Sequence, residues 1–257
     1  MSGAASPIRS TDPVRNMIVA IDGPAGAGKS TLARHLARHF GLLNLESGAM
    51  YRAFALKALR AAIPLDDSRA LEALTAETAI RLEPGEEENC VLLDGEDVTG
   101  FLRNPSVTDA ASRVSVYPAV RAWMVGLQQK LGAEGGIVME GRDIGTVVFP
   151  HAPVKIFLDA APEVRGQRRF EQLGQSGHAH TVQPAEIVRD LRARDERDRN
   201  RADSPLRPAP DAVLLDSTGM TLEEAVRAAI AIVTARLTPS PPPDTSPGRV
   251  KAPPRPV

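Results

Sequence analysis

Short apolar runs alternate with longer segments of helical periodicity between about residues 17 and 237. Apolar runs bounded by polar or glycine positions are typical of strands that are buried on both faces. The strands predicted in this way cover residues 17–22, 42–45, 136–140, 154–158 and 212–216. Because helical segments separate these strands, the pattern predicts an α/β fold: a parallel five-stranded sheet with helices on both faces.

The helical segments carry recognisable start signals. In Lys29–Phe40, the residues Leu32, Leu36 and Phe40 are spaced to form one apolar stripe. Three later segments open with a proline, which suits the first turn of a helix because its missing amide hydrogen is not needed there. Further helices are therefore expected to begin at Gly48, Pro118, Pro162, Pro184 and Thr221.

Residues 79–100 depart from this alternation. Strand-like patterns cover residues 79–83 and 89–93, and an acidic run covers residues 86–88. Asp94-Gly95 is a dipeptide that favours a tight hairpin turn. We expect a small β-rich insert attached to the central sheet.

The two ends of the chain lack any periodic apolar pattern. Residues 1–16 show none, and residues 238–257 hold eight of the 22 prolines. Proline-rich segments without apolar periodicity cannot form a packed core, so both ends are expected to be disordered. One folded domain is therefore predicted over residues 17–237.

Composition excludes several classes of protein. Apolar residues make up 42% of the chain and charged residues 25%, as in ordinary globular domains. A net charge of −1 gives no support to a general polyanion binder. Cys90 is the single cysteine, which excludes an internal disulfide and predicts a small buried apolar side chain. The sequence has neither an apolar run of about 20 residues nor an apolar secretory block, so a cytoplasmic protein that does not bind membranes is expected.

A glycine-rich loop directly follows the first predicted strand and precedes the first predicted helix. It matches the pattern G-x-x-x-x-G-K-S/T, in which backbone amides converge on phosphate oxygens at a helix N-terminus. The loop consists of Gly23, Pro24, Ala25, Gly26, Ala27, Gly28, Lys29, Ser30 and Thr31. Lys29 is expected to bridge the terminal phosphates and Ser30 to offer its hydroxyl to Mg²⁺. The predicted fold is therefore of the P-loop NTPase type.

The loop alone does not separate ATPases, GTPases and small-molecule kinases. The guanine-reading pattern N-K-x-D is absent from the sequence, and many-subunit ATPases are usually longer. We therefore favour a kinase, which needs a second anion site for the acceptor.

Two segments could supply this second site. Ser47 is expected to cap the helix after the second strand, with Arg52 one turn further on. Arg142 and Asp143 follow the strand 136–140, at the sheet edge where parallel sheets collect ligands. The alternative for Arg142 and Asp143 is an ion pair that they form with each other.

Residues 189–201 alternate arginines with acidic residues. At about 100° per residue, Arg194, Asp198 and Arg201 fall within a sector of roughly 60° on one helix face. Such a run is often a solvated helix with surface ion pairs. With a phosphate loop and a second anion site in the same chain, we favour cations that surround a migrating phosphoryl group.

Five motifs follow one another in an order that resembles bacterial cytidylate kinases, a family of nucleoside monophosphate kinases. They are IDGPAGAGKST, LESGAMYR, LDGEDVTG, EGRDIGTVVFPHAPVKIFLDA and RARDERDRNRADSPLRPAPDAVLLDST. The resemblance extends over about residues 17–236. Two departures are mild: Glu46 and His151 stand where the family usually has Asp.

The resemblance implies a role for each of several residues. Residues expected to hold the phosphate of CMP are Ser47, Tyr51, Arg52 and Arg142, and those expected to read the cytosine edge are Ser112, Arg121 and Asp143. Asp198 is expected to bind the sugar hydroxyls, while Arg194 and Arg201 reach the phosphates. Arg168 is expected to stack on the adenine of ATP, or alternatively to form surface ion pairs. The insert corresponds to a monophosphate-binding region at about residues 46–117 and the arginine-rich segment to a helical lid at about residues 165–207.

The implied reaction is the transfer of a phosphoryl group from ATP to CMP or dCMP, with Mg²⁺ bound to ATP. Lys29, Arg142, Arg194 and Arg201 are the expected catalytic cations. Three alternatives stay open: another acceptor such as UMP or a non-nucleotide metabolite, a nucleic-acid-binding protein, and a P-loop sensor that binds ATP without transfer. The acids between the arginines argue against nucleic acid. A monomer is expected.

Overall fold

The computed structural model describes residues 16–83, 85, 89–175 and 183–237. The predicted disordered ends therefore lie outside the described residues, apart from Asn16, and so does the stretch 176–182 within the predicted lid. Within the described ranges, no helix is both long enough and apolar enough to span a bilayer.

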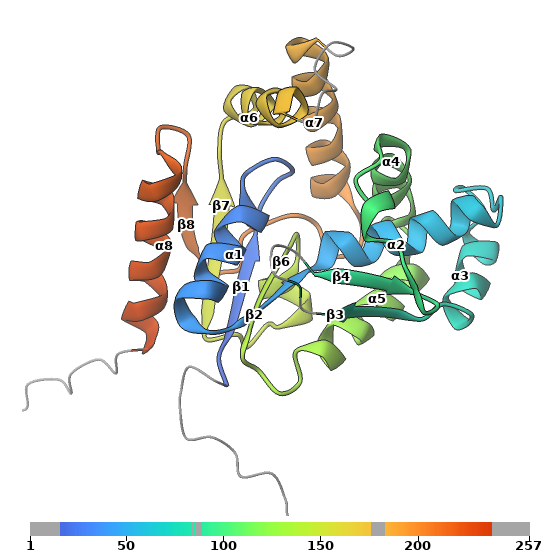
Figure 1. The fold of residues 1–257 in the computed structure, drawn as a ribbon, viewed down its shortest axis with the longest axis horizontal. Helices are drawn as coiled ribbons and strands as arrows, with labels where there is room; N and C mark the ends of the chain where they lie inside the picture. Colours follow the sequence, from blue (N-terminus) through green and yellow to red (C-terminus); the bar gives the residue numbers. More distant parts are fainter. Residues whose placement is uncertain (1–15, 84, 86–88, 176–182, 238–257) are drawn as a thin grey trace, which may run out of the picture.

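A parallel five-stranded sheet forms the centre of the molecule, as the sequence predicts (Figure 1). Its strands are β1 (Ile18–Asp22), β2 (Leu43–Glu46), β6 (Ile137–Gly141), β7 (Val154–Asp159) and β8 (Val213–Asp216), in the order β2-β6-β1-β7-β8. The strand β1 pairs with β6 on one side and with β7 on the other. The loop after β1 therefore leaves the middle of the sheet, at its carboxyl edge.

Helices cover both faces of the sheet. Alternate side chains of β1 point to opposite faces, so Val19 and Ile21 join one apolar cluster and Ala20 joins another. The first cluster includes α1 (Lys29–Phe40) and α8 (Leu222–Leu237). The second includes side chains of α5 (Pro118–Leu131) and of the short π-helix η2 (Ile144–Val148). The helix α8 begins one residue after the expected Thr221, which instead accepts a hydrogen bond from the Glu224 amide as its cap.

The region of about residues 46–117, which contains the predicted β-rich insert and is called the insert from here on, has its own hydrophobic core and contains more helix than the sequence pattern predicted. Its elements are α2 (Ser47–Arg60), α3 (Ser68–Ala76), β3 (Ile80–Glu83), β4 (Cys90–Leu93), β5 (Glu96–Asp97), the 3₁₀ turn η1 (Thr99–Phe101) and α4 (Pro105–Val114). The strands pair antiparallel, and Asp94 and Gly95, both at positive φ, form the predicted tight turn. The helices α3 and α4 were not predicted. Cys90 is half-buried and not buried as expected.

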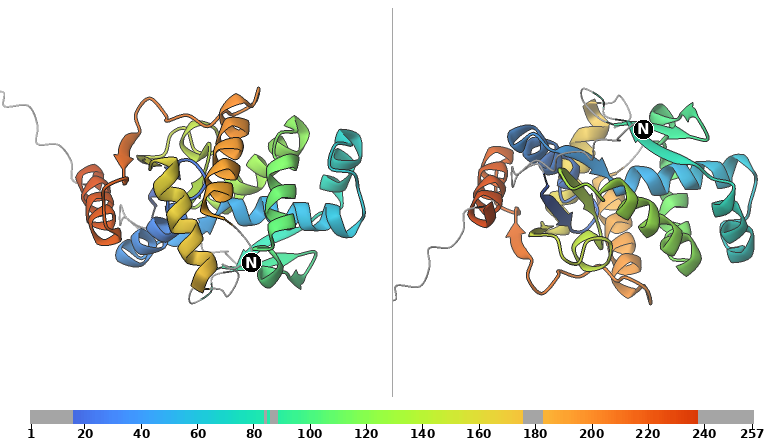
Figure 2. Two further views of the ribbon diagram at one scale, coloured as in Figure 1. Left: turned by 90° about the horizontal axis from the view of Figure 1, so that it is seen from above. Right: turned by 90° about the horizontal axis from the view of Figure 1, so that it is seen from below.

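The helices α6 (Pro162–Gln175) and α7 (Pro184–Asn200) lie above the carboxyl edge of the sheet (Figure 1). Together with α5 they begin at the predicted prolines. The views from above and below show α8 and the helix α3 of the insert at opposite ends of the molecule, with α6 and α7 between them (Figure 2). The helices α6 and α7 therefore lie over the central part of the molecule.

Candidate active site

The glycine loop turns back on itself between β1 and α1. Gly23 has φ 151°, and a Cβ at this position would lie 2.0 Å from the Leu158 carbonyl oxygen on the neighbouring strand β7. Only glycine fits so close to that backbone. Gly28, with φ 95°, leads directly into α1, whose first residue is Lys29. The loop therefore presents its amides at the positive end of α1, as an anion site requires.

Lys29 lies buried at the start of α1, and its Nζ donates to the Pro24 carbonyl at 2.7 Å. Burial lowers the pKa of Lys29 to about 7, and the nearby Arg142 and Arg194 act in the same direction against Glu140. The structure thus brings the loop lysine close to two of the predicted catalytic arginines. An anion at this position would restore the full positive charge of Lys29.

Glu140 is a site residue that sequence reasoning missed. It is buried near the end of β6, and it accepts a 2.9 Å hydrogen bond from the Ser30 hydroxyl. Burial raises the pKa of Glu140, while Lys29 opposes that shift. The available signal was an acid at the carboxyl end of a strand. Hydroxyl and carboxylate oxygens suit Mg²⁺, although among the described residues no three His, Cys, Asp or Glu side chains form a metal cage.

Asp22 is a second residue that sequence reasoning missed. Its buried carboxylate accepts hydrogen bonds from the amides of Ile144 and Gly145, both at 2.7 Å. Burial raises the pKa of Asp22 to about 7, although the two amides oppose the shift. Because Asp22 precedes Gly23 and Ile144 follows Asp143, this carboxylate ties the glycine loop to the loop that carries Asp143.

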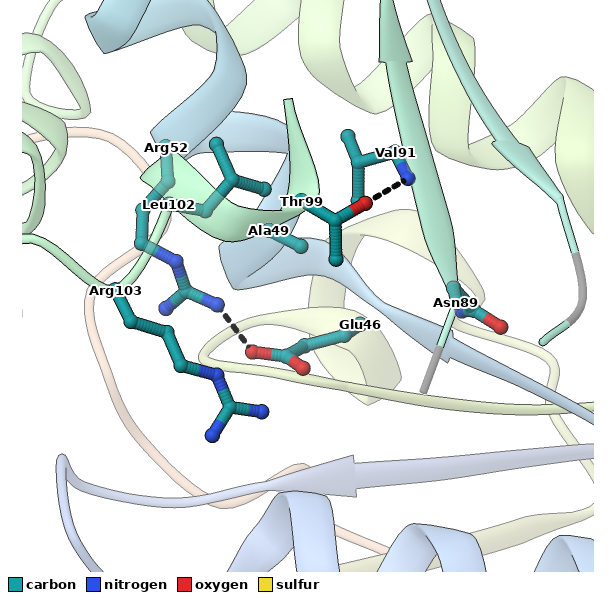
Figure 3. A pocket seen from close by; sticks show the side chains of 8 residues that line it. All are labelled: Glu46, Ala49, Arg52, Asn89, Val91, Thr99, Leu102 and Arg103. Atoms are coloured by element: carbon teal, nitrogen blue, oxygen red, sulfur yellow. Dashed lines mark hydrogen bonds and ion pairs between the residues drawn. The ribbon is translucent and has the colours of Figure 1, made fainter. Parts of the chain in front are cut away.

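Ser47 and Arg52 both lie in the first two turns of α2, and Arg52 lines a small pocket there. Ser47 is the first residue of the helix and not its cap, because its hydroxyl donates to the Glu140 carbonyl at 2.7 Å instead of accepting from a helix amide. Arg52 forms an ion pair with Glu46, and Arg103 lines the same pocket (Figure 3). Arg103 was not among the predicted residues. The pocket therefore holds two guanidinium groups beside one carboxylate.

Arg121 and Asp143 form a buried ion pair with each other. The expected alternative, an ion pair between Arg142 and Asp143, is therefore wrong. The Arg121 guanidinium also lies 6.0 Å from the ring of Tyr51, and burial raises the pKa of the Tyr51 hydroxyl to about 12. Ser112 is buried, and its hydroxyl oxygen lies 3.4 Å from the Arg197 guanidinium on α7. These contacts join the insert, η2 and the lid.

The helix α7 brings Arg194 and Asp198 close to Arg142 and Lys29, and the region that these four side chains border is termed the cleft. Arg142 donates through Nε to the Asp198 carboxylate at 2.8 Å. Although burial opposes the shift, Arg142 and Arg201 hold the pKa of Asp198 below its usual value. Burial and the nearby Arg142 lower the pKa of Arg194 to about 10. Arg201 was predicted on the helix face, but α7 ends at Asn200 and Arg201 adopts extended backbone angles.

Several guanidinium groups of this cleft retain unused hydrogen-bond donors. Among the described residues, six buried side-chain atoms lack a hydrogen-bond partner, and four of them are arginine Nε atoms. These four belong to Arg52, Arg121, Arg194 and Arg201. Buried donors without partners are costly, so their concentration at predicted site residues indicates an anionic ligand.

Arg168 lies on α6, apart from these cations. Its guanidinium donates to the Ser217 carbonyl at 2.8 Å and to the Ser217 hydroxyl at 3.2 Å. Ser217 follows β8, so Arg168 faces the loop after the last strand. Its expected stacking on adenine stays a prediction.

Comparison with known proteins agrees with this geometry. The family model described as Cytidylate kinase matches residues 19–235. A cytidylate kinase from Solibacter usitatus (strain Ellin6076) is 46% identical over 224 residues, covering 87% of this chain and 95% of the relative. A cytidylate kinase from Pasteurella multocida (strain Pm70) is 45% identical over 221 residues, covering 86% of this chain and 96% of the relative. A cytidylate kinase from Pelotomaculum thermopropionicum is 49% identical over 218 residues, covering 84% and 96%. Since the family match extends over residues 19–235, from β1 to α8, the chain belongs to the cytidylate kinase family.

Proposed function

We propose that the protein transfers the γ-phosphoryl group of ATP to CMP and dCMP, forming CDP and dCDP. The observation that carries this proposal is the set of unpaired arginine Nε donors at four predicted site residues, Arg52, Arg121, Arg194 and Arg201. One polyphosphate site beside one monophosphate site is the arrangement that this reaction needs. Family membership supports ATP as donor and CMP as acceptor.

The chemistry requires positioning and cations, and no catalytic base. An oxygen of the CMP phosphate is already ionised and attacks the γ-phosphorus in line with the departing ADP oxygen. The loose transition state spreads negative charge over the equatorial oxygens. Lys29, Arg142, Arg194 and Arg201 supply positive charge around these oxygens, and one such donor contributes on the order of 10²–10³ in rate.

Ser30 and Glu140 are the residues that would hold the Mg²⁺ that accompanies ATP. When bound, the ion neutralises charge on the β- and γ-phosphates. The hydrogen bond between the two side chains keeps both oxygens on the side of Lys29. In this proposal, Mg²⁺ therefore binds together with ATP.

The acceptor is held by residues from the insert, η2 and the lid. Ser47, Tyr51, Arg52 and Arg142 bind the monophosphate in this proposal, and Asp198 binds the sugar hydroxyls. The cytosine edge is recognised by Ser112, Arg121 and Asp143. The pairing of Arg121 with Asp143 supports this, because a fixed guanidinium beside a carboxylate offers donors and acceptors at once. Arg168 stacks on adenine.

The same proposal covers the organisation of the chain. The monophosphate-binding region comprises about residues 46–117, and the lid about residues 165–207. A monomer is part of the same proposal. The site arginines face the cleft beside acids such as Asp198, which supports small-molecule substrates and not nucleic acid. Because both nucleotides are cytoplasmic metabolites, we place the protein in the cytoplasm.

ADP release with CMP, dCMP, UMP and AMP as acceptors tests this function. We expect CMP and dCMP to be phosphorylated much faster than UMP and AMP, with CDP or dCDP identified as product. Equal rates with UMP and CMP would contradict the proposed reading of cytosine. ATP binding without CDP formation would instead indicate a sensor.

A further inference from the structure

A buried ion pair joins the two lid helices to the tip of the glycine loop. Arg165 of α6 and Asp195 of α7 are only 1% and 2% exposed, and their charged groups lie 2.7 Å apart. The Arg165 guanidinium donates to the Ala25 carbonyl at 2.8 Å. The Asp195 carboxylate accepts from the Ala25 amide at 3.2 Å. Both backbone polar groups of one loop residue are therefore held by the lid.

Further contacts fix this pair in place. Arg165 also donates through Nε to the Ala160 carbonyl at 2.8 Å, at the end of β7. A Cβ at Gly26 would lie 3.4 Å from the Arg165 Cβ, so the loop packs directly on the Arg165 side chain. The Arg165 side chain thus spans from the sheet edge to the glycine loop.

On the side of the outer strands, Arg168 of α6 also holds the lid through its hydrogen bonds to Ser217. A cavity of about 900 Å³ separates α6 and α7 from the outer strands, and Phe157 and Leu214 line it together with Arg165 and Asp195. The two lid helices pack mainly against each other. The Arg165–Asp195 pair therefore provides the contact that holds the lid to the glycine loop itself.

The position of α7 matters for the reaction. Arg194 directly precedes Asp195, and Asp198 follows three residues later on the next turn. When Asp195 is held at Ala25, the helix rotation that places Arg194 and Asp198 at the cleft is also set. A small rotation of α7 would move both side chains away from Lys29 and Arg142.

We propose that Arg165 and Asp195 are positioning residues that lock the lid onto Ala25 and thereby set the alignment of Arg194 with the glycine loop. The inference rests on the proposed function and extends it to two residues to which that function assigns no contact with ATP or CMP. Stability alone does not require this ion pair, because replacing a buried ion pair by apolar side chains of similar volume is often neutral for stability.

The double variant Arg165→Met/Asp195→Leu separates the two roles, with Asp195→Asn for comparison. Asp195→Asn leaves a buried arginine without its charge partner and should lower the melting temperature. The double variant removes both charges and should be more stable than Asp195→Asn. We nevertheless expect its kcat for CDP formation to stay about 100-fold below wild type, since small misplacements of reacting groups cost this much. The dissociation constant of ATP, measured without CMP, should change by less than about threefold because most loop amides remain.

The exposed pair Arg192–Glu163 provides the matched control, since it also joins α7 to α6 but its side chains are 60% and 62% exposed. Arg192→Met/Glu163→Leu should leave kcat within about twofold of wild type, as surface ion pairs contribute little.

Recovery of kcat together with stability in the buried double variant would overturn the inference. If that variant does not fold, Arg165→Lys, which keeps the charge but loses the forked donor geometry, must still lower kcat. An unchanged kcat in Arg165→Lys would then contradict the positioning role of Arg165. Absence of CDP formation by the wild type in the same assay would instead refute the proposed function.

Discussion

The donor and acceptor sides of the cleft are built in different ways. On the donor side, the glycine loop offers backbone amides whose positions are fixed by the sheet, by Asp22 and by the Arg165–Asp195 pair. On the acceptor side, the ligand groups are long side chains that are already bound to protein carboxylates. These ion pairs are Arg52–Glu46, Arg121–Asp143 and Arg142–Asp198.

The difference indicates two modes of recognition. The donor loop needs little rearrangement to bind a polyphosphate, because its amides already converge at a helix N-terminus. The acceptor arginines must exchange at least some contacts with carboxylates for contacts with phosphate. The unused Nε donors of Arg52 and Arg121 allow a ligand to add hydrogen bonds before these two ion pairs break. Donor-side substitutions should therefore remove turnover, whereas acceptor-side substitutions should alter selectivity.

Lys29→Ala should have the largest effect. Removing the buried ammonium group that faces the phosphates should lower kcat on the order of 10³-fold, as for loss of a charge-stabilising donor. The measurement is coupled ADP release with CMP, accompanied by a melting curve to verify the fold. The exposed Lys130→Ala serves as control and should match wild type. A normal rate in Lys29→Ala would remove the loop lysine from the mechanism.

Arg194→Ala should come next, because the side chain sits between the two sides. We expect kcat to fall on the order of 100-fold, since the guanidinium is aimed at charge that develops during transfer. The control is Arg189→Ala, an exposed arginine on the same helix. If both variants lose the same activity, the loss reflects damage to α7 and not a role at the phosphoryl group.

Asp143→Asn tests the acceptor side. Replacing the carboxylate changes one hydrogen-bond acceptor into a donor, so the ratio of kcat/KM for CMP to that for UMP should fall on the order of tenfold. Competition between the two nucleotides in one reaction measures this ratio directly. Asp109→Asn, at an exposed position of α4, should leave the ratio unchanged. An unchanged ratio in Asp143→Asn would assign Asp143 to the scaffold.

Proton uptake on ATP binding should be the smallest effect. The pKa of Lys29 is lowered to about 7 by burial, and bound phosphates would raise it again. Above pH 7, binding must therefore take up a proton, and the affinity for ATP should fall as pH rises, by at most about tenfold per pH unit. Calorimetric titration at pH 8 in two buffers of different ionisation enthalpy measures the uptake. Identical binding heats in both buffers would contradict it, and Lys29→Met should show no uptake from this group.

The sequence predicted the sheet because its strands are buried on both faces and therefore appear as continuous apolar runs. The glycine loop was equally clear, since its conformation requires glycine at fixed positions. The helices α3 and α4 were missed because each is short, and packing in the insert outweighed their weak local pattern. Asp22 and Glu140 could have been predicted as site residues, because both lie at the carboxyl ends of predicted strands.

Other parts of the site depend on contacts that no local pattern contains. Asp195 and Ala25 are 170 residues apart in the chain, so their hydrogen bond follows from tertiary packing alone. The exchange of partners around Arg142 and Asp143 has the same origin, because only the fold brings Arg121 and Asp198 to them. The prediction that Arg201 lies on the helix was wrong, because the sequence pattern did not indicate that α7 ends at Asn200.

The central claim is that a polyphosphate pocket and a monophosphate pocket face each other across one cleft. Titration with adenosine and cytidine joined through their 5′ oxygens by five phosphates tests this most directly. We predict that this molecule competes with both ATP and CMP and binds on the order of 10³-fold more tightly than either, because the second contact becomes intramolecular. Competition with ATP alone, at an affinity no better than that of ATP, would contradict the account.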